Sequence, residues 1–121
     1  MRPLILLQIA LFVGFGLVQA KTGFNETVYS PDRGVICDKK AGFCVDGYGI
    51  SMAFTEMFLG KEAQDKVMAM IDEVGADNFD TQRFSFSNKV YCDTKAKQCT
   101  TDRFNTTPEP EYNEVLFAPS E

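Results

Sequence analysis

One short stretch decides the fold of this chain: Val35-Ile36-Cys37-Asp38-Lys39-Lys40-Ala41-Gly42-Phe43-Cys44. It recurs later as Val90-Tyr91-Cys92-Asp93-Thr94-Lys95-Ala96-Lys97-Gln98-Cys99. The two copies share the Val, both Cys, the Asp, one Lys and the Ala. In each copy a strand enters through the first cysteine, the aspartate opens a turn of about four residues, and a strand leaves through the second cysteine. Each copy therefore predicts a β-hairpin.

The hairpins predict how the four cysteines pair. Cβ atoms directly opposite each other across an antiparallel ladder lie about 4.5–5.5 Å apart, which is close to the separation a disulfide requires. This geometry favours Cys37–Cys44 and Cys92–Cys99. A long bridge such as Cys37–Cys99 would restrict the unfolded chain more strongly, by about 4.3 kcal/mol against about 2.5 kcal/mol for a local bridge. Cross-pairing therefore stays open as the alternative.

The first residues, Met1–Ala20, have the form of a cleavable signal peptide. Arg2 supplies a positive charge, an apolar run extends from Leu4 to Val18, and Val18-Gln19-Ala20 fits the small-residue cleavage pattern. The apolar run is shorter than the roughly 20 residues that a membrane-spanning helix needs. Paired cysteines also indicate an oxidising compartment. We therefore expect a periplasmic or secreted protein that has no membrane association after cleavage.

The segment between the hairpins predicts helix. Ser51 is a candidate N-cap for Met52–Leu59, and Gly60 is a natural helix end. From Lys61 to about Val74 a second helical pattern places apolar residues on one face: Ala63, Val67, Met70, Ile71 and Val74. Whether Gly60 separates two helices or bends one stays open.

The rest of the chain predicts a second β segment and a tail. Alternation over Arg83–Ser87 indicates a half-buried strand, followed by strands over Val90–Asp93 and Gln98–Phe104. Residues 105–121 are polar and contain several prolines, which indicates a tail with Val115-Leu116-Phe117 able to pack back onto the core. Residues 21–104 are therefore expected to form one small disulfide-stapled α+β domain with β-hairpins and a central helix or helix pair.

The composition argues against catalysis. The chain contains no histidine, which excludes His-dependent nucleophilic chemistry. Oxidised cysteines provide no thiol nucleophile. The cysteines within each hairpin are also spaced too widely for a zinc site, which usually separates its thiolates by about two to four residues. We expect no enzymatic activity and no cofactor.

Two metal-binding interpretations are weaker than structural ones. Asp38 and Asp93 open their turns, where carboxylates accept backbone hydrogen bonds, and the ligand spacing of a calcium loop is missing. Thioether ligands suited to copper(I) are offered by Met52, Met57, Met68 and Met70. Methionine is a common core residue, so core packing of these side chains is the favoured expectation.

The charge of the chain restricts its partners. The net charge is −5, and only Arg2 is charged within the first twenty residues. Such acidity argues against nucleic acid and against anionic lipid, and it favours a protein partner with a basic surface. Phe43, Tyr48 and Phe104 are candidates for a small apolar contact surface, although aromatic residues also fill cores. The oligomeric state is unknown at this stage.

A binding or accessory role is the favoured function. The alternative is an inhibitor of a secreted hydrolase such as lysozyme, because an acidic, rigid, stapled protein suits a basic cleft. A metal-binding periplasmic protein is a further alternative. The sequons at Asn25 and Asn105 matter only in a eukaryotic cell.

Part of the chain resembles a known family. The residues that carry the resemblance are Gly34-Val35-Ile36-Cys37-Asp38, Phe43-Cys44-Val45-Asp46, Gly49-Ile50-Ser51, Thr55, Leu59-Gly60 and Ala63. They look like the Fels prophage protein-like family of small exported enterobacterial and phage proteins, of the YcgJ type. The resemblance implies a Gram-negative periplasmic protein, in which the sequons have no role. It implies no activity that can be assigned to residues here.

Overall fold

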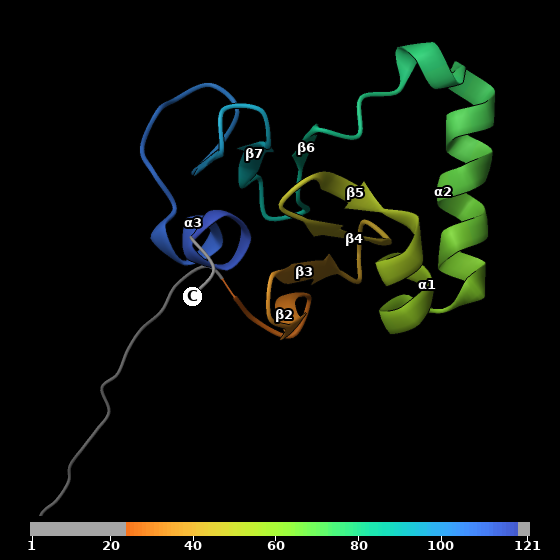
Figure 1. The fold of residues 1–121 in the computed structure, drawn as a ribbon, viewed down its shortest axis with the longest axis horizontal. Coiled ribbons are helices and arrows are strands. Elements are labelled where there is room, and N and C mark those ends of the chain that lie inside the picture. Colours follow the sequence, from red (N-terminus) through yellow and green to blue (C-terminus); the bar gives the residue numbers. More distant parts are fainter. Residues whose placement is uncertain (1–23, 119–121) are drawn as a thin grey trace, which may run out of the picture.

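The chain folds as an α+β protein, as the sequence predicts. A computed structural model describes residues 24–118, and the predicted signal peptide lies outside that range. The described part contains two antiparallel sheets and three α-helices. The first sheet occupies the middle of the molecule, with two helices on one side of it and the second sheet and the last helix on the other (Figure 1).

The first sheet is a four-stranded meander of β2 (Val28–Asp32), β3 (Val35–Asp38), β4 (Phe43–Asp46) and β5 (Gly49–Ser51). Adjacent strands are antiparallel throughout. β3 is buried on both faces, because one face covers the main core and the other is covered by a helix. This is the predicted first hairpin with one strand added on each side.

The second sheet is a three-stranded meander of β6 (Arg83–Ser85), β7 (Tyr91–Asp93) and β8 (Gln98–Thr100). The three predicted strands are present, but the last is shorter than the sequence indicated. It ends at Thr100, whose hydroxyl donates to the backbone carbonyl of Asp102 and closes a turn there.

Both sheets contain the same three-stranded unit. In each unit the strand before the hairpin places an aromatic residue opposite the first cysteine: Tyr29 in the first unit and Phe84 in the second. In each unit the last turn residue has a left-handed backbone, with φ of 89° at Gly42 and 56° at Lys97. The sequence repeat is therefore a repeat of structure that extends beyond the quoted stretch.

Gly60 separates two helices, α1 (Met52–Leu59) and α2 (Lys61–Val74), because its φ of 103° lies outside the helical region. The Ser51 side chain accepts a hydrogen bond from the Phe54 amide, as expected of an N-cap. A short 3-10 turn, η2 (Ala76–Asn78), follows α2.

The C-terminal segment contains a third helix, α3 (Pro110–Phe117), which the sequence analysis did not predict. Tyr112 and Leu116 of this helix are buried in the core, and Val115 and Phe117 pack against it. The expected return of the apolar residues to the core is therefore achieved by a helix.

The main core lies between the two sheets and α3. Its buried members are Val28, Ile36, Val45, Phe84, Phe86, Val90, Cys92, Cys99, Tyr112 and Leu116. A smaller cluster on the other face of the first sheet joins Val35, Cys37 and Cys44 to α1. Residues alternate between the two faces along β3, which explains why a single strand serves both clusters.

The expected core packing is wrong for three of the four methionines, whereas Met52 is half-buried. The exposed fractions of Met57, Met68 and Met70 are 66%, 44% and 51%. The apolar stripe of α2 is buried only at Val67, since α2 lies against α1 and β4 and extends beyond what they cover.

Candidate functional site

The two hairpins are closed by the predicted disulfides. Cys37 bonds to Cys44 and Cys92 to Cys99, and the paired residues lie directly opposite each other in their ladders. The cross-paired alternative is therefore wrong. All four cysteines are completely buried, so the two disulfides are structural and are not accessible to thiol–disulfide exchange.

A helix completes the hydrogen bonding of each hairpin. The amide of Cys44 donates to the hydroxyl of Thr55 on α1, at 2.9 Å. The amide of Cys99 donates to the side-chain oxygen of Asn113 on α3, at 2.6 Å. Each acceptor thus ties the second cysteine of a hairpin to a helix. Sequence spacing alone does not reveal these contacts, because they join separate elements.

The two turn aspartates accept backbone hydrogen bonds, as predicted. Asp38 accepts from the amides of Lys40 and Ala41, and Asp93 accepts from the corresponding amides of its own turn. Asp38 also accepts from the amide and hydroxyl of Ser87, at 2.6 and 3.0 Å. Asp38 thus links the first hairpin to the segment between β6 and β7.

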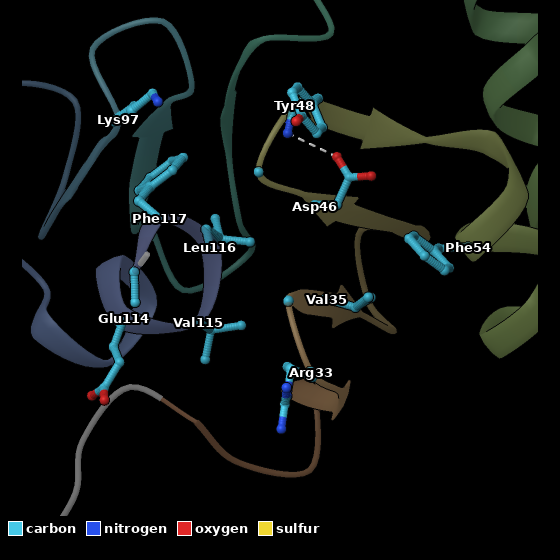
Figure 2. A pocket seen from close by; sticks show the side chains of 13 residues that line it. Arg33, Val35, Asp46, Tyr48, Phe54, Lys97, Glu114, Val115, Leu116 and Phe117 are labelled. Atoms are coloured by element: carbon cyan, nitrogen blue, oxygen red, sulfur yellow. Dashed lines mark hydrogen bonds between the residues drawn. The ribbon is translucent and has the colours of Figure 1, made fainter. Parts of the chain in front are cut away.

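The described part of the chain contains a cleft of about 780 Å³, here called the α3 cleft. One wall is the C-terminal half of α3, and the opposite wall is formed by the starts of β3 and of the β4–β5 turn (Figure 2). Val115, Leu116 and Phe117 contribute apolar surface from one wall, and Val35 and Phe54 from the other.

Two glycines allow the β4–β5 turn to form this wall. A Cβ at Gly47 would lie 2.6 Å from the backbone oxygen of Leu116, so only glycine permits this approach of the turn to α3. Gly49 has a φ of 132°, and a Cβ there would collide with the carbonyl of Thr81. That carbonyl accepts the amide of Ile50 at 2.8 Å, which joins β5 to the segment that leads into β6.

Four charged residues surround the apolar middle of the cleft. Figure 2 shows Lys97 and Glu114 on the α3 side, and Asp46 and Arg33 on the side of the first sheet. None of these side chains takes part in the ion pairs formed within residues 24–118. Asp46 accepts the amide of Tyr48 at 2.8 Å, and the Glu114 carboxylate points away from the opposite wall in Figure 2. The lining thus carries charges of both signs that are not paired with each other.

The predicted contact aromatics are placed in different environments. Phe43 packs against Phe84 and Phe86, so it belongs to the core and not to a contact surface. Tyr48 is 88% exposed at the mouth of the α3 cleft. Phe104 is equally exposed, but it lies after β8, beneath the guanidinium of Arg103.

Within residues 24–118 no three His, Cys, Asp or Glu side chains come together as a metal site. Burial raises the pKa of Tyr112 to about 12, and a hydrogen bond from Asn88 only partly opposes this effect. The hydroxyl therefore stays neutral at physiological pH.

No helix of the described segment has the length and apolarity needed to cross a bilayer.

Comparison with known proteins identifies one family. An uncharacterised protein of Escherichia coli (strain K12), YcgJ, is 36% identical over 75 residues, which cover 62% of this chain and 55% of that protein. The chain thus spans about half the length of this relative. No solved structure matches it. The family profile described as YcgJ protein matches residues 28–117, which include both disulfide hairpins and α3. The chain belongs to the YcgJ family.

Proposed function

We propose that this chain is an exported, non-enzymatic binding protein of the periplasm, and that the α3 cleft receives its partner. The observation that carries the proposal is the cleft itself: an apolar middle surrounded by four charges that have no ion-pair partner in the described structure. Pockets with apolar linings and a few polar groups are the usual form of binding sites.

Export is supported by two features. The N-terminal segment Met1–Ala20 has the pattern of a signal peptide. The two buried disulfides are typical of proteins that fold in an oxidising compartment. A non-enzymatic role is supported by the composition, because histidine is absent and both cysteine pairs are oxidised.

Site-specific photo-crosslinking in the native compartment tests the proposal. A benzophenone amino acid replaces Tyr48 at the mouth of the cleft, and in a matched variant it replaces Phe104. Both native side chains are 88% exposed, so they differ in location and not in accessibility. We expect a discrete crosslinked product from position 48 after irradiation of intact cells, and no such product from position 104.

Equal labelling of the same products from both positions would contradict the proposal, because it would show collisions and not a site. A Phe117→Asp substitution in the cleft should abolish the product from position 48, since it places a charge in the apolar middle. Circular dichroism of the purified variant verifies that it remains folded.

The acidic net charge favours a basic partner, with a secreted hydrolase such as lysozyme as a second candidate. We expect any such inhibition to be strongest at low ionic strength and to weaken as salt screens the charges. Lysozyme activity assays at low and high salt measure this. If no lysozyme is inhibited at low salt, the inhibitor function is excluded. Native mass spectrometry after exposure to copper(I) or calcium tests the metal-binding alternative. If only the metal-free protein is detected, that alternative is excluded.

A further inference from the structure

Part of the apolar stripe of α2 has no partner within the described chain. α2 forms one edge of the molecule, with α1 and the first sheet on its inner side (Figure 1). Met70 and Val74 on this helix are 51% and 45% exposed. An amphipathic helix buries an apolar stripe against a neighbour, but two of the five residues of this stripe, Met70 and Val74, remain exposed.

Met70 lies between a positive and a negative side chain of α2, Lys66 and Glu73. Lys66 precedes Met70 by four residues, and Glu73 follows it by three, so all three side chains lie on one side of the helix. Lys66 and Glu73 are exposed and take no part in the ion pairs within residues 24–118. Since they are two turns apart, about 10 Å along the helix, they do not neutralise each other.

We propose that α2 docks against α2 of a second copy of this chain, antiparallel, to form a two-fold symmetric dimer. In this arrangement Lys66 of each helix lies opposite Glu73 of the other, and the Met70 side chains meet at the centre. A parallel arrangement would place like charges opposite each other. The antiparallel pair is thus the arrangement in which charge and apolar surface agree.

The contact is small, because α2 contributes only 14 residues. Interfaces below about 1,200 Å² of total buried surface are typical of weak association. We therefore expect a monomer–dimer equilibrium and not an obligate dimer. The inference is independent of the α3 cleft, because no residue of α2 lines that cleft.

Sedimentation equilibrium of the exported, purified full chain over a concentration series tests the proposal. The wild type should show reversible dimerisation. Lys66→Glu makes both reciprocal contacts repulsive and should lower the association constant about tenfold. The double variant Lys66→Glu/Glu73→Lys restores opposite charges and should return the constant to within about threefold of wild type.

Matched controls separate this contact from general charge and hydrophobic effects. Lys95→Glu changes the net charge equally in the β7–β8 turn, and it should leave the association constant unchanged. Met70→Asp should abolish dimerisation, whereas Met57→Asp, at another exposed methionine on α1, should not. A wild type that is monomeric at every concentration would overturn the proposal. So would a double variant that fails to recover, or a Met70→Asp variant that still dimerises.

Discussion

At the scale of single residues, two equivalent aspartates of the repeat have different importance. Asp38 and Asp93 both organise a turn through one carboxylate oxygen. Asp38 is completely buried, and its other oxygen accepts the amide of Ser87. The other oxygen of Asp93 instead accepts from the Arg83 guanidinium at the surface, at 3.2 Å. The environment, and not the repeat itself, decides which carboxylate stabilises the whole fold.

Replacing each aspartate by asparagine measures this difference. An asparagine at position 38 can still organise the turn, but its NH₂ group then faces the amide of Ser87. We expect Asp38→Asn to lower the free energy of unfolding by about 2–3 kcal/mol, because a buried donor loses its acceptor. Asp93→Asn should cost less than about 1 kcal/mol. Urea denaturation of both variants checks the prediction, and equal losses would contradict it.

Because of Tyr112, the free energy of unfolding should decrease as the pH becomes alkaline. The pKa of Tyr112 in the folded chain is about 12, above the ordinary value of 10.0, so folding favours the neutral hydroxyl. The stabilisation is complete below about pH 10 and is lost as the pH rises toward 12, by about 3 kcal/mol in all. Urea denaturation at about pH 8 and pH 11 should show a smaller difference in Tyr112→Phe than in wild type. An unchanged difference would show that other groups cause the alkaline loss.

At the scale of elements, α3 depends on contacts to distant segments. The amide of Glu109 donates to the carbonyl of Cys99, and Asn113 bonds to both the amide and the carbonyl of that cysteine. These contacts cover the free edge of β8, which would otherwise expose unpaired backbone groups. A helix of eight residues is marginal on its own, so its stability comes from this docking.

Gly47→Ala tests the docking of α3 directly. The added methyl group meets the Leu116 carbonyl, so the turn or the helix must move. We expect a loss of about 1–3 kcal/mol in unfolding free energy. We also expect faster amide hydrogen exchange in α3, with little change in α2. Exchange that accelerates equally in both helices would indicate global destabilisation and not release of α3.

At the scale of the whole molecule, the stability of the fold depends on its two disulfides. Each disulfide closes a short loop, because the bonded residues are separated by seven positions in the sequence. Such a loop contributes about 2.5 kcal/mol through the unfolded state. This is a large share of the roughly 5–15 kcal/mol by which small domains are stable. The acidic chain thus combines a small core with covalent restraint.

Removing the disulfides one at a time measures how much each contributes to the free energy of unfolding. Cys37→Ser/Cys44→Ser and Cys92→Ser/Cys99→Ser should each lower the unfolding free energy by about 2–5 kcal/mol. The second pair belongs to the main core, whereas the first lies beneath α1. We therefore expect the greater loss from the second pair. Thermal unfolding of both variants measures it, and a smaller loss from the second pair would refute this ranking.

The sequence by itself determined the features that depend on neighbouring residues. The repeated Cys–Asp turns predicted both hairpins and the cysteine pairing, and Ser51 and Gly60 predicted the limits of α1. These signals are local, because a turn, a cap or a short clasp is decided by residues within about ten positions of one another.

Only the tertiary structure decided which apolar residues are covered and where a cleft forms. Phe43, the first residue of β4, packs against the core, whereas Tyr48, in the turn that follows β4, is exposed. The α3 cleft depends on the close approach of the Gly47 backbone to the carbonyl of Leu116. The docking of α3 depends on the hydrogen bond from the Cys99 amide to the side chain of Asn113. Such contacts join residues far apart in the chain. Their free energy depends on packing and on hydrogen bonds between elements, and the pattern within one element does not record it.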